Sequence, residues 1–271
     1  GAMFDLPVAI GILTATGDLP CHLIANTAFA GELALDGTIR SVKGALPMAL
    51  CAKKAGVKRV ILPEKNVREA TVAGVCIIGV SSLTELVELL LKDTKYDINP
   101  QDFQYNSFVG QESNAYDFSD IYGQNELKRA VEVAVSGCHN IFLMGCRGSG
   151  KSMIAKCIPG ILPELSEEQI IETASIYSAA GLSDDNCFKG VPPFRSVHSG
   201  IAVSALIGGG RFTQPGEISL AHNGVLFMDE MTEVHLPVIE ALRLPLEEHC
   251  VVISKYGFTE KFPADFIFVG S

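Results

Sequence analysis

The sequence lacks the features that mark membrane, secreted and zinc-binding proteins. No stretch reaches the ~18 uninterrupted apolar residues that a membrane helix needs, and no basic and apolar leader marks a secretory signal. The eight cysteines form no C-x-x-C pair and have no zinc-ligand spacing. Most lie in apolar surroundings, as Cys76 does between Val75 and Ile77. We therefore expect a cytoplasmic protein without membrane attachment, whose cysteines are reduced core residues.

The sequence also lacks a positive charge balance. Lysine and arginine number 21 against 31 aspartate and glutamate, which gives a formal net charge of −10. This balance excludes a histone-like protein whose whole surface grips nucleic acid, but it is compatible with a local basic loop. Apolar residues make up 48% of the chain and charged residues 19%, so large cores can be buried. The 271 residues suit about two domains of roughly 100–200 residues each.

A polar stretch divides the chain. Residues 93–122 carry six acidic groups and one basic group, and they show no sustained periodicity. We interpret most of this stretch as a linker. The predicted organisation is a first domain over residues 3–92, an acidic linker over 93–116 and a second domain over 117–271.

The first block alternates helix and strand signals, which predicts an α/β domain. It opens abruptly on the apolar run Phe4–Leu13, so we expect the chain to start inside a domain whose earlier strands are absent. Gly56 is a typical stop signal after the first predicted helix. The predicted segments are a helix at Ala45–Leu50, strands at Val57–Leu62 and Val75–Val80, and a helix that Ser82 and Glu85 cap as a capping box.

The second block alternates helices with strands whose apolar runs are uninterrupted. Such strands are typical of a parallel sheet covered by helices on both faces. The predicted segments are a helix at Leu127–Val135 ended by Gly137, a strand at Ile141–Met144, a helix from Lys151, a helix capped by Ser166 and Gln169 that runs to about Ser178, and strands at Val225–Met228 and Phe266–Val269.

A glycine-rich loop follows the first of these strands. Its eight residues match G-x-x-x-x-G-K-[ST] in full. The glycines allow a tight turn whose N–H groups point at phosphate oxygens, and the following helix adds its positive dipole end. We expect Lys151 to reach the β- and γ-phosphates and Ser152 to offer its hydroxyl to Mg²⁺. The predicted nucleotide-binding residues are Gly145, Cys146, Arg147, Gly148, Ser149, Gly150, Lys151 and Ser152.

Two acidic residues end the strand Val225–Met228 and complete the predicted site. Asp229 is expected to hold Mg²⁺ through its water shell, and Glu230 to polarise the attacking water. The predicted catalytic residues are thus Lys151, Asp229 and Glu230, with ATP rather than GTP as substrate. Asp229 follows Lys151 by 78 residues. That separation predicts a functional insertion, which we place at Val191–Leu220.

Three segments resemble magnesium-chelatase-like AAA+ ATPases of the ComM/YifB type. They are Asp117–Gln124, Phe194–His198 and the long run from Gly208-Gly209-Gly210 through Pro215-Gly216-Glu217 to Asp229-Glu230. The resemblance implies a P-loop AAA+ parallel-sheet core that uses ATP and Mg²⁺. It also implies that Tyr122 and Gly123 lie in an entry motif whose backbone borders the adenine. The sequence departs from the family at Val197, where proline or histidine is usual.

The first block resembles the N-terminal domain of the same family, whose fold is that of Lon-type proteases. The matching positions include Gly31-Glu32-Leu33 and Ile61-Leu62-Pro63-Glu64. Lon-type proteases use a Ser–Lys dyad, but here Asp5 and Met48 occupy the two positions. Methionine cannot activate a nucleophile and a carboxylate is not the needed hydroxyl. We therefore expect a non-proteolytic domain that serves assembly or partner binding.

The resemblance further implies a hexameric ring that acts as a DNA-dependent ATPase in branch migration. A hairpin is predicted around Gly257, between Val251–Ser254 and Thr259–Phe262. Its possible DNA-contacting residues are Lys255, Tyr256 and Lys261. Six copies would focus these few cations into one pore, although a simple sheet-edge hairpin is the alternative.

Two other functions fit the same sequence. One is a magnesium-chelatase-like ATPase that remodels a protein partner during metal insertion, and the other is a nucleotide-regulated scaffold. We expect the family's sensor residue, arginine finger and helical lid to follow Ser271, so that the lid is absent from this chain. Because a ring ATPase needs a neighbour's arginine, the chain alone is expected to hydrolyse ATP poorly.

Overall fold

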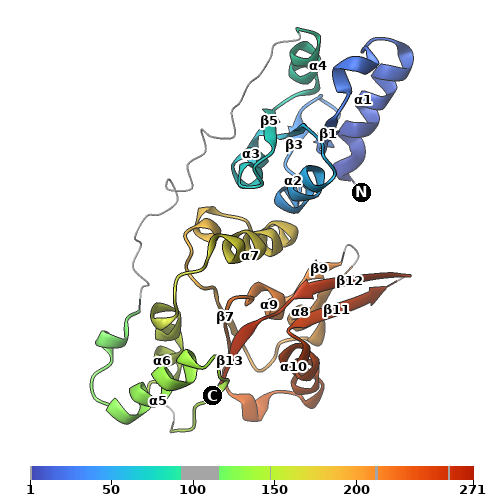
Figure 1. The fold of residues 1–271 in the computed structure, drawn as a ribbon. Coiled ribbons are helices and arrows are strands. Elements are labelled where there is room, and N and C mark those ends of the chain that lie inside the picture. The colour runs from blue at the N-terminus through green and yellow to red at the C-terminus, as the bar shows by residue number, and fades with distance from the viewer. Residues whose placement is uncertain (1, 93–115, 147, 211–212, 256) are drawn as a thin grey trace. The chain divides into compact units, whose positions relative to one another are not determined.

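The computed structural model describes residues 2–92, 116–146, 148–210, 213–255 and 257–271 (Figure 1). The chain divides into two compact units. Unit 1 comprises residues 1–108 and 177–185, and unit 2 comprises residues 109–176 and 186–271. The predicted linker, residues 93–116, falls almost entirely outside the described residues, so the predicted domain boundaries stay a prediction.

Unit 1 is α/β, as the alternating signals predicted. Strands β1, β4 and β5 form a parallel sheet in the order β1-β4-β5, and β2 and β3 form an antiparallel pair. The elements are α1 (Asp5–Thr16), β1 (Thr27–Phe29), β2 (Glu32–Leu33), β3 (Ile39–Arg40), α2 (Ala45–Lys54), β4 (Arg59–Pro63), α3 (Glu64–Thr71), β5 (Cys76–Val80) and α4 (Leu83–Leu91). The likeness to Lon-type proteases stays a prediction.

The core of unit 1 joins its first helix to the sheet. Leu6 and Ile10 lie one turn apart on α1 and pack in the same buried cluster as Ile61 of β4 and Ile78 of β5. The apolar opening of the chain is therefore a helix, and the predicted strands are present as β4 and β5. Among the described residues, no helix of either unit is long and apolar enough to cross a membrane.

The cap of α4 differs in one respect from the predicted capping box. The Ser82 hydroxyl accepts from the Glu85 N–H at 3.2 Å, as expected. The Glu85 carboxylate, however, accepts mainly from the N–H and hydroxyl of Ser81, and the Ser82 N–H makes the smallest contribution among the hydrogen bonds that lower its pKa. Ser81 offers two donors to one carboxylate oxygen, and both bonds lower the pKa of Glu85.

Unit 2 is built around a parallel sheet in the order β6-β13-β10-β7. Its elements are α5 (Asn125–Ser136), β6 (Ile141–Phe142), α6 (Lys151–Cys157), α7 (Glu167–Ala180), β7 (Phe194–Val197), α8 (Val203–Ile207), β8 (Gly208–Gly209), β9 (Gln214–Pro215), α9 (Glu217–Leu220), β10 (Gly224–Met228), α10 (Leu236–Glu248), β11 (Cys250–Lys255), β12 (Phe258–Pro263) and β13 (Phe266–Gly270). The last four residues of α7 belong to unit 1.

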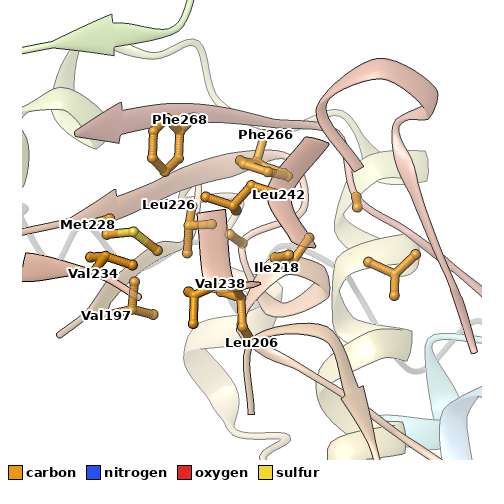
Figure 2. Packing of buried hydrophobic residues seen from close by; sticks show 13 residues of the cluster. Val197, Leu206, Ile218, Leu226, Met228, Val234, Val238, Leu242, Phe266 and Phe268 are labelled. Carbon is orange, nitrogen blue, oxygen red and sulfur yellow. The ribbon is translucent and has the colours of Figure 1, made fainter. Parts of the chain in front are cut away.

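Alternate residues of the central strands pack on opposite faces of this sheet. Val225 and Phe227 of β10 join a core with α5 and α6. Leu226 and Met228 join a second core with α8, α9 and α10, which Figure 2 shows from close by. Every residue of β10 and β13 is buried. The predicted parallel sheet with helices on both faces is confirmed.

The segment predicted as an insertion supplies a fourth strand of the sheet. β7 lies within residues 191–220 and pairs with β10, so the strand predicted as the third and last of the core, β13, is the fourth in chain order. This correction has a physical reason, because Arg195 and Ser196 interrupt the apolar pattern of an edge strand. Arg195 is satisfied by a bidentate ion pair with Glu217 at 2.6 and 2.8 Å.

The other local predictions for unit 2 are largely confirmed. Ser166 and Gln169 form a full capping box, in which each side chain accepts from the other residue's N–H. β11 and β12 form the predicted antiparallel hairpin around Gly257. The strand β6 is shorter than predicted, because it ends at Phe142 and not at Met144.

The cysteines lie less deeply in the cores than the sequence predicted. Two of them, Cys157 and Cys250, are buried. An apolar neighbour in the chain does not fix burial, because the two sides of a helix face different surroundings. The exposed cysteines are Cys21, Cys51, Cys138 and Cys146.

The close approach of β10 to the segment before β7 yields a stability prediction. A Cβ at Gly224 would lie 2.1 Å from the carbonyl oxygen of Pro193. Gly224→Ala should therefore lower the free energy of unfolding by about 1–3 kcal/mol, the usual cost of overpacking. The measurement is a urea titration followed by circular dichroism. The matched control is Gly200→Ala, where a Cβ would meet nothing within 4 Å; an equal loss in both variants would contradict the steric argument.

Candidate nucleotide-binding site

The glycine loop lies between β6 and α6, at the carboxyl end of the sheet. Gly148 and Gly150 have left-handed backbone conformations, with φ of 77° and 88°, and open space surrounds both. Residues with a Cβ rarely adopt this conformation, so the two glycines allow the tight turn. Arg147 lies outside the described residues. Gly148 and Gly150 therefore have the backbone conformations that a tight turn requires, and the nucleotide-binding role of the loop stays a prediction.

Lys151 folds back over this loop. Its Nζ donates to the carbonyl oxygens of Gly145 and Cys146, both at 2.9 Å. Cys146 is exposed and contributes its backbone carbonyl to this contact. The ammonium group is thus held at the loop, where a phosphate oxygen could replace either carbonyl as its partner.

Asp229 follows β10 directly, and three donors hold its carboxylate. Ser152 donates from its hydroxyl to Oδ2 at 3.1 Å, and the Glu230 N–H donates to Oδ1 at 3.0 Å. The hydroxyl of Ser271 also donates to Oδ1. The Ser271 bond is the largest cause that lowers the pKa of Asp229, and Ser152, Glu230 and the charge of Lys151 lower it further against a smaller effect of burial. The carboxyl is therefore ionised at neutral pH.

Glu230 has a left-handed backbone, with φ of 54° and ψ of 47°. This conformation is uncommon for a residue with a side chain, and such residues concentrate at functional sites. Glu230 is exposed and borders a cleft of about 650 Å³. The residues lining that cleft are Phe142, Leu143, Met144, Gly145, Gly148, Ser149, Gly150, Lys151, Ser152, Met153, Asp229, Glu230, Thr232, Glu233 and Ser271.

The entry segment is tied to the loop by residues other than those predicted to border the base. Tyr122 is 94% exposed and Gly123 has φ of 71°, and neither lines the cleft. The Gln124 side chain donates to the Ser149 carbonyl at 3.3 Å, and the Lys128 ammonium donates to the Ile121 carbonyl. The role of Tyr122 and Gly123 stays a prediction.

The hairpin places its two predicted DNA-contacting lysines on opposite faces. Lys261 pairs with Val252 and Lys255 with Phe258, and faces alternate along a strand. Lys255 Nζ donates to the Gly210 carbonyl at 3.0 Å, in the loop after β8. Lys261 is exposed and shares its face with the exposed residues Val252 and Ser254. The structure therefore does not bring the two lysines together, and Tyr256 lies outside the described residues.

Sequence reasoning missed Ser271 as a member of the site. Ser271 is 42 residues from Asp229 in the chain, and only the pairing of β13 with β10 brings it there. The usable signal is a polar residue directly after the neighbouring strand, because carboxyl ends of parallel strands meet at one edge. Using that signal requires knowing that β13 lies next to β10 in the sheet, and the order of the strands in the sequence does not reveal this.

These residues fit a nucleotide with a magnesium ion. Mg²⁺ prefers oxygen ligands and usually binds through one or two protein groups, phosphate oxygens and water. Ser152 and Asp229 offer a hydroxyl and a carboxylate in contact with one another, and the left-handed glycines leave open space at the loop. A glycine loop between strand and helix, a lysine folded over it and a serine–aspartate contact define the P-loop class of α/β proteins.

Comparison with known proteins places the chain within that class. Residues 117–271 match the family described as magnesium chelatase, subunit ChlI, and residues 1–66 match a second profile described as subunit ChlI of Mg-chelatase. The chain belongs to this family, as a ComM/YifB-type magnesium-chelatase-like protein. The predicted resemblance and the AAA+ parallel-sheet core are confirmed.

Relatives match along the whole chain. Competence protein ComM of Haemophilus influenzae is 38% identical over 274 residues, which cover 100% of this chain and 53% of that protein. An uncharacterized protein of Mycobacterium tuberculosis is 38% identical over 276 residues, covering 98% and 52%. YifB of Escherichia coli, also uncharacterized, is 35% identical over 272 residues, covering 100% and 53%. The chain thus spans about half the length of these relatives.

The contacts of Lys151 yield a binding prediction. Lys151→Ala should weaken the affinity for an ATP analogue by about 10- to 100-fold, since a hydrogen bond to a charged group is worth about 1.5–3 kcal/mol. The measurement is a titration with a fluorescent ATP analogue. Lys156→Ala is the matched control on the same helix, because the Lys156 ammonium lies 5.1 Å from the ring centroid of Tyr116 and not at the loop. Equal losses in the two variants would contradict the assignment.

Proposed function

We propose that the protein binds and hydrolyses ATP with Mg²⁺ and uses the energy to act on DNA. The observation that carries the ATPase part is the contact between Ser152 and Asp229, which joins the glycine loop to the end of β10. Two oxygen ligands for Mg²⁺ thereby lie in the same cleft as Lys151 and Glu230. When bound, Mg²⁺ would neutralise charge on the phosphates.

The side chains of this cleft have distinct roles in the proposal. Lys151 would exchange the loop carbonyls for phosphate oxygens. Ser152 would offer a lone pair of its hydroxyl oxygen to the metal while its O–H still donates a hydrogen bond to Asp229. Asp229 remains ionised, because its hydrogen bonds hold its pKa low. Glu230 accepts a proton from the attacking water. Its exposed side chain at the cleft supports this role.

Two observations favour DNA as the second partner. A relative at 38% identity is named as a competence protein. The hairpin also presents the exposed Lys261 beside Ser254 and Val252 on one face, a combination of charge and hydrogen-bonding groups that suits a phosphate backbone. In a protein of net charge −10, such a contact needs several subunits, so a ring, as the family resemblance implies, belongs to the proposal.

A protein partner is the alternative, and one observation favours it. Relatives at 27% identity over 159 residues are named as a magnesium-chelatase 67 kDa subunit. In this second proposal, the segment of residues 191–220 outside β7 would contact the partner protein. A substitution of Lys255 would not distinguish the two proposals, because Lys255 donates to the Gly210 carbonyl within that segment and the change would affect both regions. Lys261 is the sharper probe.

The test is ATP turnover by the longer protein with no DNA, single-stranded DNA and branched DNA. Lys151→Ala provides the blank. We expect DNA to stimulate turnover and Lys261→Ala to weaken DNA binding. The slope of log K against log salt concentration should become shallower by about 1 for each subunit whose Lys261 contacts DNA, because one lysine neutralises one phosphate.

The matched control removes the same charge elsewhere. Lys58→Ala changes an exposed lysine of unit 1 and should leave DNA stimulation intact. A rate of ATP turnover that is the same with and without each DNA would refute the proposed action on DNA and favour a protein partner. Nucleotide binding without turnover above the blank would refute both and leave a nucleotide-regulated scaffold.

A further inference from the structure

The chain places a serine beside Asp229 at the carboxyl end of β13. Ser271 is fixed there by its backbone, because its N–H donates to the Met228 carbonyl at 3.0 Å and its carbonyl accepts from the Met231 N–H at 2.9 Å. The bonded partners lie on either side of Asp229 and Glu230 in the sequence. The Ser271 hydroxyl is thereby directed at Asp229, and it donates to Oδ1.

The two oxygens of Asp229 have different partners. Oδ1 accepts from Ser271 and from the Glu230 N–H, whereas Oδ2 accepts from Ser152. Rotation of the carboxylate about its Cβ–Cγ bond would break both bonds to Oδ1. The two donors on Oδ1 therefore keep Oδ2 turned toward Ser152 and the cleft that both residues line.

We infer that Ser271 is a positioning residue for the magnesium site. Its hydroxyl orients Asp229 so that Oδ2 faces the Ser152 hydroxyl, and it acts on the metal through Asp229. The inference rests on the proposed function, because it requires Ser152 and Asp229 to hold Mg²⁺. Residues that orient a ligand in this way typically change metal affinity by about 10–100-fold when they are replaced.

The effect of the Ser271 hydroxyl can be tested apart from the effect of the backbone at the same position. A Cβ at Gly270 would lie 2.3 Å from the Met231 sulfur and 3.0 Å from a ring carbon of Phe142. The strand end is therefore packed tightly by groups other than the serine side chain. Ser271→Ala removes the hydroxyl and keeps both backbone hydrogen bonds, whereas Ser271→Thr keeps the hydroxyl.

The experiment uses Mn²⁺ as the probe and measures its binding to the complex of the full chain with ADP by electron paramagnetic resonance. Mn²⁺ takes the same oxygen ligands as Mg²⁺. We expect Ser271→Ala to weaken Mn²⁺ binding by about tenfold or more and to leave ADP affinity in excess EDTA unchanged. Ser271→Thr should restore Mn²⁺ binding. Ser136→Ala is the control, since its hydroxyl donates to the Glu132 carbonyl within α5, and it should change neither quantity.

The outcomes separate the inference from the function on which it rests. Mn²⁺ affinity that is unchanged in Ser271→Ala would overturn the positioning role while the nucleotide site stands. Equal loss of Mn²⁺ and metal-free ADP binding in both Ser271 variants would also overturn it, because the serine would then serve the loop structure alone. A wild-type chain that binds no nucleotide in any condition would overturn the proposed function itself.

Discussion

The parallel pairing of β10 with β7 on one side and β13 on the other is the constraint on which unit 2 depends. All five residues of β10 are buried, and they alternate between two cores, so each face requires its own set of side chains. A shift of one residue in the register would turn each side chain of β10 to the opposite face of the sheet, where the helices pack against a different set of side chains. The register therefore has one solution. That solution fixes where β10 ends, and with it the position of Asp229.

The candidate site follows from that strand end. Its parts come from three segments that are distant in sequence, the glycine loop with Ser152, the pair Asp229 and Glu230, and Ser271. Parallel strands bring their carboxyl ends to one edge, where backbone groups and polar side chains are no longer buried in the cores. At this edge Asp229 gains three donors, and Lys151 lies on the same cleft. The low pKa of Asp229 is thus mainly a consequence of strand order, because its largest cause is the hydrogen bond from Ser271, whereas the Glu230 N–H beside it in the chain makes a smaller contribution.

The sequence predicts the helices and strands that depend on interactions between residues close together in the chain. β10 and β13 have uninterrupted apolar runs, and β4 and β5 contain shorter apolar runs of three residues. The cap of α7 depends on two side chains three residues apart. β7 was missed because Arg195 lies in the strand, and its compensation by Glu217 lies 22 residues on. Ser271 was missed for the same kind of reason, since its partner is 42 residues away. The glycine loop was predictable because its motif is contiguous, whereas the opposite faces of Lys255 and Lys261 emerge from the pairing register.

The strand β13 joins the two regions that the proposed function must couple. The hairpin ends at Pro263, β13 begins at Phe266, and its five residues lead to Ser271 beside Asp229. At about 3.3 Å per residue the strand spans roughly 17 Å. β13 is buried on both faces and paired with β6 and β10, so bending it would disturb a core. In the proposed function, β13 is therefore the short connection along the chain between Asp229, which Ser271 contacts, and the hairpin that carries Lys261.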